Sequence, residues 1–103
     1  MANLGSKQRG DTFKITKTFY SGSTATFPLS CNVSVTEPNG DAIFTNMSGM
    51  KTGTTGEFYY YISSVSDAQL GLYRIQWDGM IDYGTWGNLP EVYTDEFQLV
   101  DIV

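Results

Sequence analysis

A run of aromatic and β-branched residues at positions 57–63 constrains the fold of this chain more than any other feature. Phe58, Tyr60 and Ile62 alternate there with Tyr59 and Tyr61. Successive side chains of a β-strand point to opposite faces, so the first three residues share one face. Such side chains suit a half-buried sheet surface, and a continuous run does not select the single stripe of an amphipathic helix. The run therefore predicts a strand.

A second strand is expected at 72–77, where apolar and polar residues alternate: Tyr73, Ile75 and Trp77 against Arg74 and Gln76. One apolar and one polar face is typical of an antiparallel sheet that is wet on one side. Between the two strands, the polar stretch 65–70 has room for at most one helical turn, with Ser66 as its N-cap. Gly71 then provides a positive φ or a close backbone approach.

The cleanest alternation in the chain comes earlier and places the single cysteine, Cys31, among four apolar residues of the same parity: Phe27, Leu29, Val33 and Val35. This phase predicts a strand that buries Cys31 as an inert thiol. The turn formers Asn39 and Gly40 follow, and they predict a hairpin turn at 37–41 because both tolerate positive φ.

Taken together, the pattern predicts about seven short strands separated by turn residues, at 11–20, 27–35, 42–47, 51–55 (a weak strand or a loop), 57–63, 72–77 and 92–103. In the first of these, Lys17 interrupts the apolar face, which suits an edge strand or a bend. The chain has 103 residues, 41% of them hydrophobic and 11 of them glycine. This length and composition predict one all-β domain, a sandwich of antiparallel strands.

Three patterns resemble the late strands of immunoglobulin-like β-sandwiches: G-E-F-x-Y-x-I at 56–62, G-x-Y-x-I-x-W at 71–77, and the closing Glu96-Phe97-Gln98-Leu99. The resemblance extends from about Gly10 onward and includes the macroglobulin-type domains and the small structural proteins of tailed-bacteriophage virions. It implies an immunoglobulin-like sandwich at residues 11–103, preceded by an extended N-terminal arm at residues 1–10.

The chain has no histidine and only one cysteine, so it lacks the commonest general base and the usual zinc ligands. Two acidic pairs remain as candidates for acid–base chemistry, Asp78 with Asp82 and Asp95 with Glu96. Acidic residues in the loops of β-proteins are usually solvated, so we interpret these carboxylates as solvated loop acids. The spacing of Asp78, Asp82 and Asp95 also matches no calcium-binding loop. The expectation is a protein that is not an enzyme and that uses no cofactor and no metal.

The net charge of −5 speaks against a nucleic-acid partner, for which basic patches provide most of the affinity. No run of about 18 apolar residues is present, and the first ten residues lack the apolar core of a signal peptide. We therefore expect no membrane insertion and synthesis in a host cytoplasm.

The segment 78–91 is expected to be one long loop, and long loops are often functional. It contains Tyr83 and Trp86, and Tyr93 follows it. Tryptophan and tyrosine are enriched at interface hot spots and also stack on sugars. The alternative is that the hairpin simply extends to Tyr83 while Trp86 folds back to cap the end of the domain.

Both ends of the chain are further candidates for contacts. The arm carries Lys7 and Arg9, and the chain closes on Ile102 and Val103. We expect the arm to lie on a neighbouring subunit or on its own domain, and the apolar end to dock likewise. Because four of the six basic residues lie in the first 17 positions, copies of the chain are candidates for head-to-tail association, with internal neutralisation as the alternative.

These features favour a non-catalytic structural protein of a bacteriophage virion: a capsid decoration, a head–tail neck component or a tail accessory protein. Its partners would be other virion proteins or copies of itself. The alternative is a monomeric surface module that binds a peptide or a host-surface glycan on Tyr83, Trp86 and Tyr93.

Overall fold

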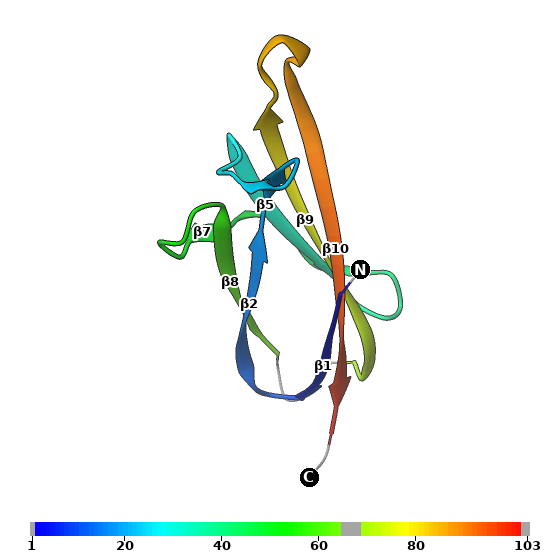
Figure 1. Ribbon diagram of the computed structural model, residues 1–103. Coiled ribbons are helices and arrows are strands. Elements are labelled where there is room, and N and C mark those ends of the chain that lie inside the picture. Colours follow the sequence, from blue (N-terminus) through cyan, green and yellow to red (C-terminus); the bar gives the residue numbers. More distant parts are fainter. Residues whose placement is uncertain (1, 65–68, 102–103) are drawn as a thin grey trace.

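The computed structural model describes residues 2–64 and 69–101, which are built almost entirely of β-strands (Figure 1). Within these residues there are ten strands and one turn of 3-10 helix. In chain order they are β1 (Ala2–Gln8), β2 (Thr12–Thr18), β3 (Tyr20–Ser21), β4 (Thr24–Ala25), β5 (Ser30–Thr36), β6 (Ala42–Ser48), β7 (Met50–Lys51), β8 (Glu57–Ser63), β9 (Gly71–Asp82), η1 (Gly84–Trp86) and β10 (Asn88–Val100).

Two sheets hold most of these strands. The larger has five strands in the order β1-β10-β9-β5-β6, and the smaller has three in the order β2-β8-β7. Strands β3 and β4 pair with each other as a small ribbon. All pairings are antiparallel except that of β1 with β10, which is parallel. The all-β class is therefore confirmed.

The core lies between the two sheets and is made of the inward faces that the alternation predicts. In β9 the buried residues include Tyr73, Ile75 and Trp77, while Arg74 and Gln76 are exposed. The other buried apolar residues come from both sheets and from the segment after β2: Ile15, Phe19, Cys31, Val33, Val35, Phe58, Ile62, Ile81, Phe97 and Leu99. Aromatic rings meet across the gap, with Phe13 of β2 edge-on to Phe97 of β10 at 5.0 Å between ring centroids.

A buried ion pair joins the sheets. Lys17 of β2 places its Nζ 2.8 Å from the Oδ2 of Asp95 on β10, and only 1% of Asp95 is exposed to solvent. The lysine that interrupts the apolar pattern is thus directed inward toward a carboxylate. Strand β2 is an edge of its sheet, as the pattern predicts.

Gly79 provides the space for a second link between the layers. A Cβ at this position would lie 2.5 Å from Cε2 of Phe19, so the ring rests directly on the backbone of β9. The Phe19 ring is also edge-on to Phe58 of β8 and to Tyr93 of β10, with centroid distances of 5.9 and 5.2 Å. The chain segment after β2 is thereby fixed against both sheets.

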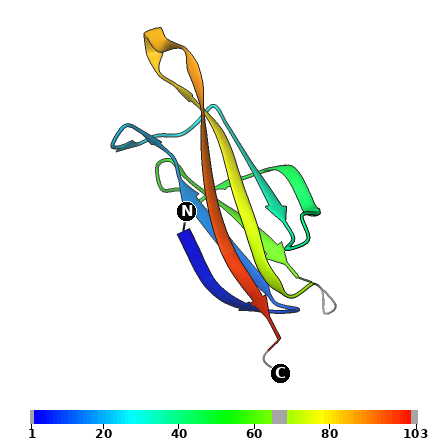
Figure 2. The same cartoon turned by 90° about the vertical axis from the view of Figure 1, so that its right-hand side faces the viewer.

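The first ten residues differ from the expected arm. Residues Ala2–Gln8 form β1, which lies alongside the C-terminal half of β10 and extends the five-stranded sheet (Figure 2). The pairing runs from Ala2 opposite Asp95 to Gln8 opposite Val100, with an irregularity between Asn3 and Ser6. The segment was expected to lie either on a neighbouring subunit or on its own domain, and in the structure it packs on its own domain.

Two apolar residues expected in the core lie outside it. Strand β5 begins at Ser30, and Phe27 and Leu29 precede it with 39% and 63% of their surface exposed. The β3–β4 ribbon and Pro28 occupy this region, so the alternation does not continue as a strand through them. The turn at 37–41 is confirmed: the Glu37 N–H donates to the Asp41 carbonyl at 2.7 Å, and Gly40 has φ +96°.

Most of the segment between β8 and β9, with the expected cap Ser66, lies outside the described residues. Cys31 faces the core. Burial, and to a smaller extent the negative charge of the nearby Asp78 carboxylate, raise the pKa of its thiol to about 11.

We expect Lys17→Met to lower the free energy of unfolding by about 3–5 kcal/mol, because it removes the Lys17 ammonium from the buried Asp95 carboxylate. Urea unfolding checks this. The double variant Lys17→Met/Asp95→Asn removes the buried charge and should recover part of the loss. Equal stability of the single and double variants would contradict the importance of the pair.

Cys31 should be unreactive in the folded protein. With a thiol pKa of about 11, roughly 0.1% is thiolate at pH 8, and burial also blocks access. Labelling with Ellman's reagent should be at least tenfold slower in buffer than in 6 M guanidinium, where one thiol should react promptly. Equally fast labelling in both would show that the thiol is accessible.

Candidate interaction site

The segment expected as a long loop is the outer part of a β-hairpin. Strands β9 and β10 pair without interruption from Gly71 opposite Leu99 to Asp82 opposite Asn88. Strand β5 reaches only as far as Met80, so beyond that point the hairpin continues with two strands and projects from the rest of the domain (Figure 1). The principal extents of 53 × 26 × 20 Å reflect this projection.

Pro90 explains why this part of the sequence does not look like a strand. Proline cannot donate to a ladder and is confined to edges and irregular positions. Opposite Pro90, the Met80 carbonyl accepts from the Leu29 N–H on the β5 side, so the Met80–Pro90 pair does not exchange hydrogen bonds. The nitrogen of Pro90 therefore faces the side of β10 that β1 does not reach at this level.

A compact turn closes the hairpin. The Asp82 carboxylate accepts from the Gly84 N–H at 2.8 Å, and the Tyr83 N–H donates to the Gly87 carbonyl at 2.9 Å. Gly84 and Gly87 have φ of +66° and +83°, which residues with a side chain rarely adopt. The two glycines that flank Trp86 are therefore required by the turn.

Trp86 is the most exposed large apolar side chain in the part of the chain that the structure describes, at 82%. It lies in η1 at the end of the hairpin and does not fold back to cap the domain. A side chain this exposed contributes little to the core. The expected long loop is thus corrected to an extended hairpin, and the expected capping of the domain by Trp86 is wrong, while a contact role for Trp86 stays a prediction.

Tyr83 is held to the opposite strand. Its hydroxyl donates to the Oε1 of Glu91. This hydrogen bond, with a smaller effect of burial, raises the pKa of Tyr83 above its ordinary value. The phenol ties the two strands together at the level where β5 has ended, so its polar end is already occupied.

Tyr93 does not join this group. It packs partly buried against Phe19, and the Lys17 ammonium lies 5.8 Å from its ring centroid. It belongs to the base of the hairpin, five residues along β10 from Asn88. The structure thus brings Tyr83 and Trp86 to one turn but places Tyr93 elsewhere, so the expected three-ring platform is not present.

The other residues expected to make contacts lie far from Trp86 along the long axis of the molecule. Lys7 is on β1 with its Nζ 5.4 Å from the Phe13 ring centroid, and Arg9 forms an ion pair with Asp101. Both lie at the end where β10 finishes, opposite the projecting turn (Figure 1). Ile102 and Val103 lie outside the described residues. The ion pairs of Arg9 and Lys17 show internal neutralisation for two of the four N-terminal basic residues.

Other exposed apolar residues accompany Trp86 on the outer hairpin and at its base: Leu29, Leu89 and Val92. The alternation assigns Leu29 to the core and the loop expected at 78–91 hides the strand at Leu89, whereas Val92 opens the strand expected at 92–103. Positions 79–92 include two acidic residues, Asp82 and Glu91, and no basic residue. The projection is therefore an apolar surface with negative charge.

The chain matches no protein-family model, and no curated protein or solved structure is significantly similar to it. The described residues include no helix of the length and apolar character needed to cross a membrane. They also include no group of three or more acidic or cysteine side chains placed to hold a metal ion.

We expect Glu91→Gln to lower the pKa of Tyr83 toward the ordinary value near 10, because the neutral amide no longer favours the protonated phenol. The raised pKa of the folded state means that this bond stabilises the hairpin below about pH 10 and is lost as the pH rises through the raised pKa. The pKa of Tyr83 is measured by following the NMR chemical shifts of the tyrosine ring carbons as the pH is raised. The Tyr83→Phe variant identifies which resonance belongs to Tyr83. An unchanged pKa in Glu91→Gln would contradict the bond.

Proposed function

We propose that this chain is a non-catalytic structural protein of an assembly, a component of a tailed-bacteriophage particle, and that the projecting hairpin is its main contact. The observation that carries the proposal is Trp86, held in an ordered turn at the end of a two-stranded projection with 82% of its surface exposed. Folding gives no reason for that exposure. An interface does, because tryptophan is enriched at binding hot spots.

The topology supports the immunoglobulin-like part of the proposal. In such sandwiches strands C, F and G share one sheet, and strands B, E and D share the other. Here β5, β9 and β10 are neighbours in one sheet in the positions of C, F and G. Strands β2, β8 and β7 form the other in the positions of B, E and D, and β6 extends the first sheet as a C′ strand does.

The energy available at Trp86 is enough for a specific contact. A buried tryptophan covers about 150–250 Å², which is worth roughly 4–6 kcal/mol before the costs of association. Leu89 and Val92 add exposed apolar area nearby along the hairpin. A partner that covers this projection therefore gains most from one side chain that the fold itself does not use.

The glycan- or peptide-binding alternative has less support. It needs several aromatic faces in one platform, but the Tyr83 hydroxyl is bound to Glu91 and Tyr93 packs on Phe19. Trp86 alone remains to stack on a sugar. A glycan titration that changes tryptophan fluorescence in the wild type and not in Trp86→Ala would favour this alternative over assembly.

We expect Trp86→Ala to leave the free energy of unfolding within about 0.5 kcal/mol of the wild type while reducing incorporation into particles by at least tenfold. Incorporation is measured by complementing a phage that lacks the gene and probing purified particles with antibody. Tyr61→Ala, which removes an exposed aromatic from β8, is the matched control and should incorporate normally. Normal incorporation of Trp86→Ala would overturn the proposal.

A further inference from the structure

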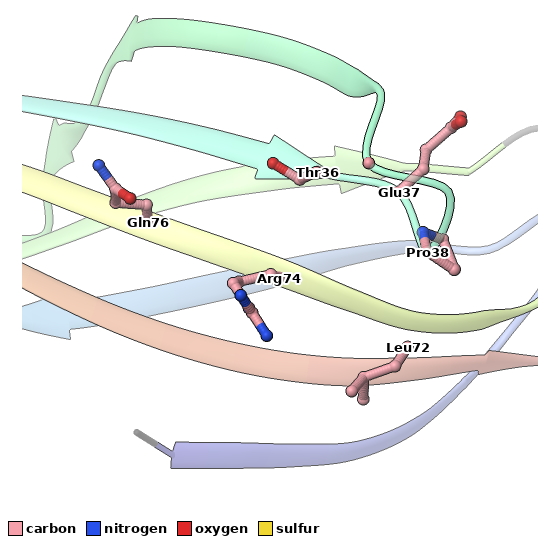
Figure 3. Close-up of a pocket in the computed structure, with 7 residues that line it drawn as sticks. Thr36, Glu37, Pro38, Leu72, Arg74 and Gln76 are labelled. Atoms are coloured by element: carbon pink, nitrogen blue, oxygen red, sulfur yellow. The ribbon is translucent and has the colours of Figure 1, made fainter.

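A groove lies on the outer face of the five-stranded sheet, away from the projecting turn. It has a volume of about 500 Å³ and is formed where the turn after β5 meets the first half of β9 (Figure 3). Its lining combines apolar, polar and cationic groups: Thr36, Glu37, Pro38, Gly40, Leu72, Arg74 and Gln76. Its position is fixed by the contact of Pro38 with Gly71, where an added Cβ would lie 3.0 Å from the proline Cγ.

The apolar part of the groove is unusual for its surroundings. On the outer face of β9, Gln76 and Asp78 are polar and Met80 is partly buried, yet Leu72 is 46% exposed there and lines the groove together with Pro38. Folding gains little from a leucine in this position. Leu72 and Pro38, the two apolar side chains of the lining, form the apolar wall of the groove.

Arg74 supplies a planar cation next to that wall. In the part of the chain that the structure describes, Arg74 forms no ion pair, and the carboxylate of Glu37 points away from it (Figure 3). Arginine stacks its guanidinium on aromatic faces, and tryptophan is the best partner for such a contact. An apolar wall beside a planar cation is a receptor for an aromatic ring.

The same chain displays such a ring, but it cannot reach its own groove. Arg74 and Asp82 are eight residues apart on β9, which at about 3.4 Å per residue separates them by roughly 27 Å along a straight ladder. Trp86 lies beyond Asp82 at the end of the hairpin. A contact between ring and groove must therefore join two molecules.

We infer that Trp86 of one copy docks in the Leu72–Arg74 groove of a second copy, with its indole against Leu72 and Pro38 and its face on the guanidinium of Arg74. The hairpin beyond Gly79 carries Asp82 and Glu91 without a basic residue, and Arg74 is the cation of the groove. Glu37, which also lines the groove, directs its carboxylate away from Arg74 (Figure 3), and Glu96, opposite Arg74 on β10, accepts a hydrogen bond from the Asn3 side chain. The inference rests on the proposed function and names the partner of the hairpin as the chain itself.

This contact joins two different patches and is therefore heterologous. Such contacts form rings when the rotation between copies closes and open filaments when it does not. Repeated structural proteins in particles use both arrangements, so the contact suits the proposed function. It also requires only one ring and one groove per copy.

Cysteine cross-linking of the full chain tests the contact directly. Thr85→Cys places a thiol beside Trp86, and Gln76→Cys places one on the lining of the groove. An oxidised mixture of the two single variants should give a disulfide-linked dimer, whereas each variant alone should give at least tenfold less. Cys31 stays in place because it is buried. Adding Trp86→Ala to the first variant should abolish the cross-link in the mixture.

Analytical ultracentrifugation measures the same contact without cysteines. Trp86→Ala and Arg74→Glu should each weaken self-association by at least roughly tenfold, and Tyr61→Ala should change it less than twofold. A wild-type chain that stays monomeric at millimolar concentration, or a mixture that does not cross-link, overturns the inference. If Trp86→Ala still loses incorporation into particles in that case, the proposed function stands with a different partner. If it incorporates normally, both fail.

Discussion

The continuous ladder between β9 and β10 is the interaction on which the rest of the structure depends. Most of it forms the centre of the five-stranded sheet, where Trp77 and Phe97 face the core. Its outer end extends beyond Met80, the last residue of β9 that pairs with β5, and closes in the turn that holds Trp86. The same backbone hydrogen bonds thus support both the core and the exposed side chain, so the position of Trp86 follows from the core without a separate scaffold.

An isolated two-stranded hairpin is only marginally stable in water, so the projection needs support at its base. Phe19 rests on Gly79 and meets Tyr93, and the Lys17–Asp95 pair lies beside them on β2 and β10. Ile81 is fully buried one step further out. These contacts link the second sheet to the hairpin where β5 ends, and they explain why Tyr93 belongs to the support and not to the exposed turn.

Period-two alternation predicts the buried faces of β8 and β9 because each strand has one dry face, which a single sequence reveals. It does not predict β1, whose residues have no apolar periodicity and are ordered by pairing with β10, some 90 residues later in the chain. The sequence pattern also gives the wrong prediction at Leu29 and at Pro90. The alternation assigned the leucine to the core although β5 starts after it, and the proline suggested a loop although its nitrogen faces an unpaired edge.

The candidate site was only partly predictable for the same physical reason. Sequence identifies Trp86 as exceeding the needs of a strand core, because two glycines flank it, but whether it is exposed depends on how far the hairpin extends beyond its neighbours. Arg74 and Leu72 look like ordinary wet-face residues in the sequence, and only the adjacent turn at Pro38 makes them one wall of a groove. Contact surfaces of this kind use residues on which the fold does not depend. We therefore expect that Trp86 and Arg74 can be changed without loss of structure, whereas Tyr83 and Tyr93 also hold the hairpin in place.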